Sequence, residues 1–425
     1  MKKTIFAFCC LFAAVSPALA VEWQSFGPRA MGMGGAGVAV AQGPVASYWN
    51  PAGLGQVENP SGFELPVGAQ ASVNGSLIQG VKDLNQLNGC LGSGGNYTNC
   101  GYSSTGQAQT AINNTLNELG GGGANLDGGV GAELKLGRLV LFVNDLFYAG
   151  EGASIDNVHT SITPGTDYVG NNTSKAYING ISMTEIGLGY GHELPWVKGL
   201  SVGANLKAIV GETGYGSLDI VSGTKPTFSQ SNNTKQSIEP GIDLGALWDL
   251  NRLLPFLPFR PRVALVARNI NAPSFKQPAD AATDNLVSGN LDVGRQVRLG
   301  AAISPFHWWN IAADADLTRN YTVTGLPSRE VALGTEINVF NRSWINIPLR
   351  AGLSKNTALS NSGYQWSLGA GLNFLHVIID AAGTISQDQV AIQSQGKSTK
   401  IPESFGGMIQ ISVLFGGAPA KAKAS

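Results

Sequence analysis

Apolar and polar residues alternate along many separate segments of this chain. In the segment 201–210, one set of alternate positions is apolar: Val202, Ala204, Leu206, Ala208 and Val210. The intervening positions are polar or small, with Ile209 as the exception. A two-residue period over this length is typical of a β-strand with one apolar face, and the spacing of an amphipathic helix is absent.

Fourteen segments of this kind occur, and a closed antiparallel barrel of the bacterial outer membrane requires an even number of strands. Some connections are very short, such as the one at Gly137, whereas others are long, such as 76–127 and 150–180. Short turns at one rim and long loops at the other are typical of these barrels, although strict alternation between rims does not hold throughout this set. The predicted strands are 62–75, 128–136, 138–149, 181–192, 199–211, 237–249, 262–271, 294–304, 309–322, 329–339, 345–355, 364–374, 376–387 and 404–415.

One face of the predicted strands is aliphatic and the other carries charges of both signs. A soluble β-sandwich would show the same local pattern, because it buries the aliphatic face and exposes the charges to water. Three features favour a barrel: the strands are many and long, small residues concentrate on the charged face, and aromatic residues gather near strand ends, as in membrane girdles. We therefore predict an all-β fold, a transmembrane antiparallel β-barrel of about 14 strands. The aromatic residues are Phe142, Phe147, Tyr148, Trp248, Trp308, Trp309, Tyr321, Trp344, Phe374 and Phe415.

The first 20 residues have the pattern of a cleaved secretory signal peptide. Lys2 and Lys3 precede an apolar stretch, and Ala18-Leu19-Ala20 is a small-residue cleavage site, so the mature chain is expected to begin at Val21. Beyond it there is no run of about 18 apolar residues, so a closed barrel is the expected way to span a membrane. The 27 basic and 28 acidic residues nearly balance, which argues against a nucleic-acid partner.

Two cysteines remain in the mature chain, Cys90 and Cys100. In an exported protein, two cysteines this close most simply form a disulfide, and we predict one. The residues between them include no His, Asp or Glu, so a metal site is not predicted there.

The segment 21–57 differs from the rest of the chain, because it is rich in small and apolar residues and shows little alternation. Its Gly32-Met33-Gly34-Gly35-Ala36-Gly37 run formally satisfies G-x-G-x-x-G, but no strand precedes it, so a nucleotide site is not predicted. A flexible periplasmic leader is one interpretation. The apolar composition favours the other interpretation, a plug folded inside the barrel, with Asn50 satisfying backbone groups at a turn that Pro51 fixes.

This segment resembles the N-terminal hatch of the long-chain fatty-acid transporter (FadL-like) superfamily. The resemblance rests on Gly-Pro-Arg-Ala-Met-Gly-Met-Gly-Gly-Ala-Gly at 27–37, Trp-Asn-Pro-Ala-Gly-Leu at 49–54 and Arg-Asn-Ile-Asn-Ala-Pro-Ser-Phe at 268–275. Within the superfamily, the chain is most similar to conjugal-transfer TraF-like outer-membrane proteins, which also resemble PorV-type barrels. The resemblance implies a hatch at 21–57, a fourteen-stranded barrel at 58–415 and a Gram-negative outer-membrane location. The candidate gate residues are Gly34, Gly37, Asn50, Pro51 and Gly53.

One departure from the superfamily lies at the C-terminus. Its barrels tend to end on an aromatic residue, whereas here Phe415 is followed by residues 416–425, with Lys421 and Lys423. We interpret this as a flexible tail, which leaves the aromatic insertion signal internal.

The charged face is the remaining candidate for chemistry. Asp314 and Asp316 lie two residues apart on one face of a predicted strand, where they could hold Ca²⁺ or pair with lumen arginines; we favour ion pairing. None of the four histidines has a second histidine at ligand spacing, so no metal, cofactor or enzymatic activity is predicted. Residues 106–119 carry apolar residues at helical spacing and predict an amphipathic helix in the first long loop. The predicted lumen charge network comprises Glu185, Lys207, Asp243, Arg298, Asp314, Asp316, Glu336 and Arg350, and Glu133, Lys135 and Glu330 share that face.

Two functions follow from the sequence and the resemblance. The first is passive transport of hydrophobic small molecules across the outer membrane, gated by the N-terminal hatch. The alternative is a structural or accessory component of a conjugation or secretion apparatus. The expected partners are outer-membrane lipid in both cases, a hydrophobic ligand in the first and apparatus proteins in the second. A general water-filled porin is disfavoured, because a plug obstructs ion flow.

Overall fold

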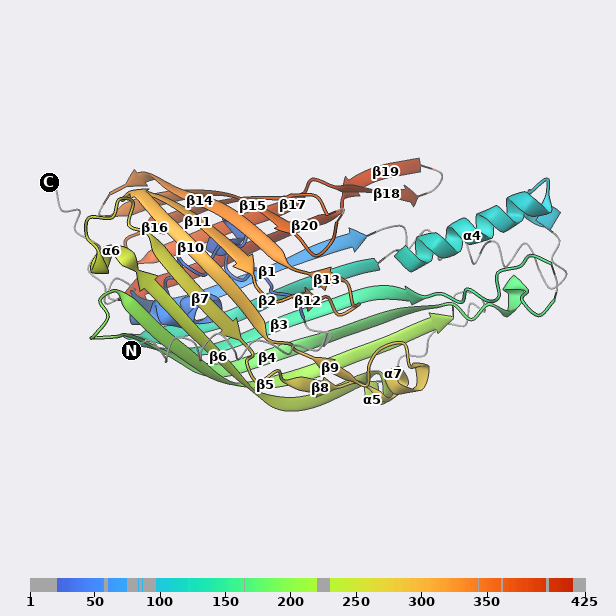
Figure 1. Cartoon of the computed structure of the whole chain (residues 1–425), viewed down its shortest axis with the longest axis horizontal. Coiled ribbons are helices and arrows are strands. Elements are labelled where there is room, and N and C mark those ends of the chain that lie inside the picture. Colours follow the sequence, from blue (N-terminus) through green and yellow to red (C-terminus); the bar gives the residue numbers. More distant parts are fainter. Residues whose placement is uncertain are drawn as a thin grey trace, which may run out of the picture.

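A single sheet closes on itself to form the body of the protein (Figure 1). The computed structural model describes residues 21–56, 60–74, 83, 86, 97–121, 123–163, 165–219, 230–342, 344–360, 362–394 and 397–415. The prediction of a fourteen-stranded antiparallel barrel is confirmed. In barrel order the strands are β1 (Ser61–Asn74), β2 (Gly123–Leu136), β3 (Leu139–Ser154), β4 (Lys175–Glu193), β5 (Leu200–Asp219), β6 (Thr234–Asp249), β7 (Arg262–Arg268), β10 (Gln296–Phe306), β11 (Trp309–Asp316), β14 (Glu330–Asn341), β15 (Ile345–Asn356), β16 (Gln365–Phe374), β17 (Val377–Ser386) and β20 (Ser404–Phe415).

The first and last strands close the barrel. Phe63 in β1 lies opposite Leu134 in β2 on one side and opposite Val413 in β20 on the other. Closure pairs the backbone of every strand on both sides, which is what a sheet in hydrocarbon needs. It also excludes the β-sandwich alternative. The barrel is one closed sheet whose aliphatic residues point outward, so they do not pack against a second layer.

Two predicted strands end earlier than expected. The predicted strand 309–322 ends at Asp316, because the chain leaves the wall and Asn320–Tyr321 (β12) pairs instead with Pro327–Ser328 (β13). The predicted strand 262–271 ends at Arg268, because Asn269 has a positive φ of 51° and its N–H turns to the carboxylate of Asp243. With these corrections the five shortest connections, of two to six residues, all lie at one rim. The longer β6–β7 loop lies at that rim too, so the alternation of short and long connections is not strict, as expected from the sequence. In outer-membrane barrels the short-turn rim is periplasmic.

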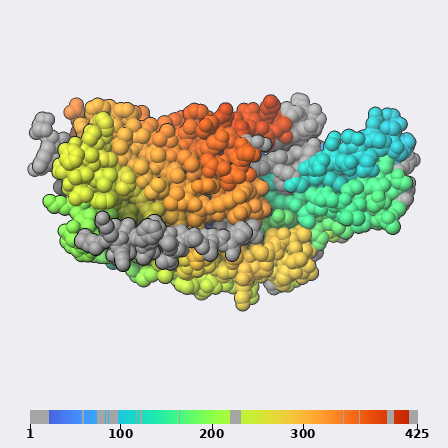
Figure 2. Space-filling view, in the orientation of Figure 1, coloured from blue at the N-terminus to red at the C-terminus, as the bar shows by residue number. Residues whose placement is uncertain are grey.

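The wall is much taller on one side than on the other. β4 has 19 residues and β5 has 20, whereas β7 has 7. The tall side extends beyond the long-loop rim together with α4, and Figure 2 shows this extension in cyan and green. The remaining elements are η3 (Tyr97–Cys100), α4 (Thr105–Gly121), η4 (Val169–Asn171), α5 (Gln230–Asn233), α6 (Leu250–Leu253), β8 (Ser274–Lys276), α7 (Ala279–Asp284), β9 (Asn290–Asp292), β18 (Gln389–Ser394) and β19 (Lys397–Pro402).

The predicted amphipathic helix is α4, and its apolar side is covered within the extension. Ala108, Ile112 and Leu116 are buried against Ile162 and Tyr168 of the loop that joins β3 to β4. Burial of these side chains stabilises the helix, since an isolated helix of this length is marginal in water. The exposed side of α4 is polar.

The barrel wall turns its aliphatic residues outward and most of its charges inward. Leu206 is 57% exposed, whereas its neighbour Lys207 is 6% exposed. Two aromatic assignments were wrong: Phe142 and Tyr148 are buried in the lumen, because they fall on the inward positions of β3. In the described part of the chain, no helix combines the length and the apolar character needed to cross a bilayer.

Candidate functional site

The lumen is occupied by residues 21–56, which we call the N-terminal segment. It forms three short helices, α1 (Pro28–Gly32), α2 (Ala46–Trp49) and η2 (Pro51–Gly55), and nearly all of its side chains are buried. Proline at the first positions of α1 and η2 suits a helix start, and Gly34, with φ of +71°, turns the chain after α1. The blue ribbon inside the barrel in Figure 1 is this segment.

Four aromatic side chains form the centre of the N-terminal segment. The ring of Tyr48 lies 4.9 Å from that of Phe26 and 5.7 Å from that of Trp49, and Trp23 lies 6.0 Å from Trp49. The polar atoms of two rings bond to the segment's own backbone: Tyr48 Oη donates to the carbonyl of Gln24, and Trp49 Nε1 donates to that of Phe26. The segment therefore has a small core of its own.

Two wall arginines lie over these rings. The guanidinium carbon of Arg268 is 3.9 Å from the centre of the Tyr48 ring, and that of Arg298 is 4.7 Å from Trp23. Cation–π contacts of this kind are strongest where water is excluded, as it is around these buried residues. They join the aromatic core to β7 and β10.

Asn50 makes the turn between α2 and η2. Its side-chain oxygen accepts a hydrogen bond from the N–H of Ala52 at 3.0 Å, and its amide donates to the carbonyl of Ala246 in β6 at 3.1 Å. Pro51 follows with its backbone against Gly203 in β5. Asn50 thus satisfies backbone groups both at the turn and on the wall.

A set of wall glycines lets the backbone of the N-terminal segment touch the sheet. A Cβ atom at Gly191 would lie 2.5 Å from the nitrogen of Gly55, and one at Gly369 would lie 3.1 Å from the Cα of Gly32. Side chains at the other members of the set would overlap the segment more severely. We call this set, which lies on β4, β5, β6, β14, β15 and β16, the wall glycines: Gly191, Gly203, Gly245, Gly334, Gly352 and Gly369.

Three candidate gate residues lie at close approaches. A Cβ atom at Gly34 would lie 2.7 Å from the backbone nitrogen of Leu353 in β15, so this position sits directly against the wall. At Gly37 the same atom would contact the Trp49 ring at 2.5 Å, and at Gly53 it would lie 2.9 Å from the carbonyl of Ala41. These two glycines permit packing within the segment.

An ionic chain fastens α1 to the wall. Arg29 Nε and Nη2 donate to the two carboxylate oxygens of Glu336 at 2.9 and 2.8 Å. Arg350 Nε donates to the same carboxylate at 2.8 Å and its Nη1 donates to Asp380 at 2.6 Å. Glu336 therefore joins the segment to β14, β15 and β17, and bidentate pairing of this kind is geometrically specific.

The other predicted lumen charges form separate groups. Lys207 Nζ lies 2.8 Å from Glu185 and 3.2 Å from Asp243. Arg298 pairs with Asp316 at 2.6 Å.

Asp314 has a different role from Asp316, because it accepts hydrogen bonds from the N–H groups of Gly37 and Val38 at 2.8 and 2.9 Å. Its partners are thus backbone donors of the N-terminal segment. No group of three or more metal-ligating side chains occurs among the residues that the structure describes.

Four residues of the site were not predicted from the sequence: Arg29, Glu64, Arg268 and Asp380. Glu64 accepts a hydrogen bond from the N–H of Val45 at 2.7 Å, so it too holds the segment. Glu64 and Asp380 occupy inward positions of their strands, so the alternation along those strands could have identified them as lumen residues. The role of Arg29 had no such signal, since the segment has no strand period.

In the extension, Asp156 organises the loop that joins β3 to β4. Its carboxylate accepts hydrogen bonds from the N–H groups of Val158 and Thr173, and His159 Nδ1 lies 2.7 Å from it. Burial alone would raise the pKa of Asp156, but these bonds outweigh burial and hold the pKa well below its ordinary value.

Three predictions fall outside the described residues: the signal peptide 1–20, Cys90 of the expected disulfide with Cys100, and the tail 416–425. They stay predictions.

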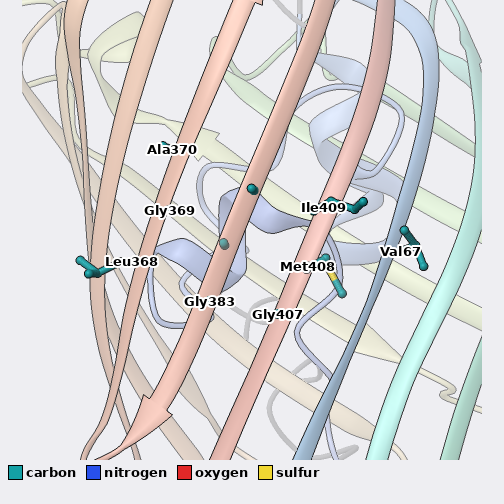
Figure 3. Close-up of a pocket in the computed structure, with 10 residues that line it drawn as sticks. Val67, Leu368, Gly369, Ala370, Gly383, Gly407, Met408 and Ile409 are labelled. Atoms are coloured by element: carbon teal, nitrogen blue, oxygen red, sulfur yellow. The ribbon is translucent and has the colours of Figure 1, made fainter.

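The outer surface of the wall has a hollow of about 690 Å³ across β16, β17, β20 and β1 (Figure 3). Small residues such as Gly383 and Gly407 form its floor, and Leu368, Val67 and Ile409 stand at its sides. α1 packs against the inner side of the same strands, where Gly32 meets Gly369. Only the wall separates the hollow from the N-terminal segment.

A family model and several solved structures match the chain, while no curated protein matches it. The TodX monoaromatic hydrocarbon channel deltaS2 mutant superposes with a TM-score of 0.50 and 12% identity, covering 93% of this chain and 100% of that one. The toluene transporter TodX of P. putida has a TM-score of 0.49 and 12% identity, over 93% of this chain and 99% of its own. The toluene transporter TbuX of Ralstonia pickettii has a TM-score of 0.48 and 13% identity, over 93% of this chain and 100% of its own. The first match shows a shared fold.

The family model for the F plasmid transfer operon TraF protein matches residues 47–316. This range begins in α2 and ends with β11, so it takes in η2 and more than half of the barrel but not α1. The resemblance drawn from the sequence is confirmed for both relatives. The chain shares the barrel fold of the TodX monoaromatic hydrocarbon channel, and it belongs to the F plasmid transfer operon TraF protein family.

Proposed function

We propose that this protein is a passive outer-membrane transporter for hydrophobic small molecules and that residues 21–57 are its gate. The observation that carries the proposal is the fit between the N-terminal segment and the wall glycines, where backbone meets backbone. A water-filled porin keeps an open lumen, and this packing does not support one. A hydrophobic molecule can instead pass when a segment of small residues shifts.

The contacts of α1 indicate what must change for passage. Arg29 is the cation that α1 contributes to the ionic chain with Glu336, Arg350 and Asp380. A shift of α1 would leave the two wall acids, Glu336 and Asp380, with Arg350 as their remaining cation in this chain. The ionic chain would thus set the energy needed to open the gate.

The hollow in the outer wall supports a route toward the bilayer on the side of α1. Its lining residues are all apolar, and the small residues on its floor keep the wall thin. A hydrophobic molecule released by a shift of α1 would reach hydrocarbon without crossing the periplasmic rim. In this proposal Glu336 and Arg29 are gating residues, and Gly369 lies at the exit.

Uptake tests this proposal directly. Cells that carry the protein should take up labelled toluene or oleate faster than empty cells, at matched levels of inserted barrel. Arg29→Gln should raise planar-bilayer conductance several-fold, and Arg342→Gln in an exposed turn is the matched control. Conductance that does not change when residues 21–57 are deleted would show that the segment does not block the lumen. An uptake rate equal to that of empty cells would rule out these substrates.

The second candidate function is an accessory component of a conjugation apparatus. It is favoured by the match to the TraF family model and by the extension that carries α4 beyond the long-loop rim. Deleting residues 105–121 separates the two functions. If the extension serves an apparatus, plasmid transfer falls while toluene uptake stays; if the protein is only a transporter, transfer is unaffected.

A further inference from the structure

The loop between β6 and β7 is unusual for the short-turn rim. It spans residues 250–261, whereas the turn between β16 and β17 has only Leu375 and His376. Its sequence is Leu-Asn-Arg-Leu-Leu-Pro-Phe-Leu-Pro-Phe-Arg-Pro, with no acidic residue. Most of its large apolar side chains lie outside any core: Phe256 is 77% exposed and Phe259 is 54% exposed.

The loop is held firmly although its side chains are exposed. The N–H of Leu250 donates to the carbonyl of Pro261 at 3.1 Å, and the N–H of Ser304 in β10 donates to that of Phe259 at 2.6 Å. The Asn251 amide donates to the carbonyls of Pro255 and Leu257 at 3.4 and 3.3 Å. These bonds fix a conformation that presents apolar groups to the exterior.

Two residues of the loop are in a strained conformation. Phe259 and Arg260 have φ angles of 64° and 44°, in the left-handed region that side chains other than glycine disfavour. Such a backbone conformation is costly and persists only where the surroundings enforce it. A loop that merely joined two strands would not need this strain.

The neighbouring rim extends the apolar surface. Trp196, in the turn between β4 and β5, is 76% exposed. That turn is joined to the end of β6, directly before the loop, by a hydrogen bond from the N–H of Asp249 to the carbonyl of Gly199. Phe306 on β10 is 53% exposed. Aromatic side chains at the edge of a membrane barrel prefer the headgroup level, where one side is apolar and the other wet.

The charges of this surface are basic. Arg252 and Arg260 are exposed within the loop, and Lys198 is exposed in the adjoining turn. Two acids border the loop at strand ends: Glu193 is paired with Arg252, and Asp249 accepts a hydrogen bond from the N–H of Asn251. Exposed aromatic and aliphatic groups next to exposed cations are the pattern of a segment that binds an anionic lipid surface.

We propose that the β6–β7 loop and Trp196 form an interfacial anchor, which inserts into the headgroup region of the periplasmic leaflet. The lipid chemistry that it recognises is an apolar acyl region beneath anionic phosphate. The anchor is independent of the transport proposal, since no hydrogen bond or ion pair joins its residues to the N-terminal segment in the described structure.

Spin labels report how deeply a side chain lies in the bilayer, and that depth tests the proposed anchor. Single cysteines replace Phe256, Leu206 or Val158 in a chain with Cys90→Ser and Cys100→Ser, reconstituted in vesicles of phosphatidylethanolamine with or without phosphatidylglycerol. All three positions are exposed, so the label does not disturb a core. Leu206 is the hydrocarbon control and Val158, in the β3–β4 loop, is the water control.

The expected result is an oxygen-to-nickel-chelate accessibility ratio at Phe256 between those of the two controls, higher when phosphatidylglycerol is present. Arg260→Gln should reduce the dependence on phosphatidylglycerol. A label at Phe256 that is as accessible to the nickel chelate as the label at Val158 would overturn the proposal and identify the loop as a water-exposed docking face for a protein.

Discussion

Leu206→Arg is the most direct test of which side of the wall faces lipid. Leu206 lies six positions into β5 from the short-turn rim and is 57% exposed on the outer face. Six residues of strand rise about 20 Å, and a tilt near 40° leaves roughly 15 Å along the barrel axis. That depth is close to the middle of an apolar band about 25 Å tall.

The expected cost follows from this depth. An arginine at the midplane of an outer-membrane barrel costs about 2–4 kcal/mol, and one near the interface costs about 0–1 kcal/mol. Val202 provides the matched control, because it lies on the same face of the same strand, only two positions from the rim. Leu206→Ala measures the loss of the aliphatic group without an added charge.

The measurement is equilibrium unfolding in lipid vesicles, followed by tryptophan fluorescence. Leu206→Arg should lower the free energy of unfolding by about 2–4 kcal/mol and Val202→Arg by at most about 1 kcal/mol. Equal stability of Leu206→Arg and the parent would refute the outward assignment of this face. A larger cost at Val202 than at Leu206 would refute the depth assignment.

Three further predictions concern the N-terminal segment and the extension. Gly334→Ala places a methyl group against the carbonyl oxygen of Met33; we expect a loss of about 1–3 kcal/mol and increased conductance in planar bilayers, and unchanged conductance would contradict the close fit. Asp314→Ala leaves the N–H groups that it accepts, including that of Gly37, without their acceptor; we expect about 1–3 kcal/mol lower stability by denaturant unfolding, and no change would mean that water replaces the carboxylate. Because the pKa of Asp156 is held below its ordinary value, its contribution to the loop is complete above about pH 4 and is lost as the pH falls further. Hydrogen exchange in residues 155–163 should therefore accelerate below pH 4 in the parent, while Asp156→Asn should exchange fast at every pH.

Much of the fold could be read from alternation alone. In a strand the side chains point to opposite faces in turn, so the parity of Leu206 and Lys207 places one in lipid and the other in the lumen. Parity also places Asp314 and Asp316 together on the inner face. The girdle assignment of Phe142 and Tyr148 failed because it relied on closeness to strand ends and did not use parity, which places both residues inward.

Parity could not predict which partner each lumen charge has. Asp314 and Asp316 look alike in sequence, yet one accepts bonds from Gly37 and Val38 and the other pairs with Arg298. Which partner each acid meets depends on residues that are hundreds of positions away, so no local pattern contains the answer. The same is true of Arg29 and Glu336.

The sequence by itself thus determined a closed barrel, its strands and the side chains that face lipid, because these follow from a local two-residue period and from the need to pair every strand in hydrocarbon. Only the tertiary structure decided where the N-terminal segment lies, which glycines it touches and where β7 and β11 leave the wall. These features depend on how a segment without a period fits a closed surface, and that fit is set by the shape of the whole lumen.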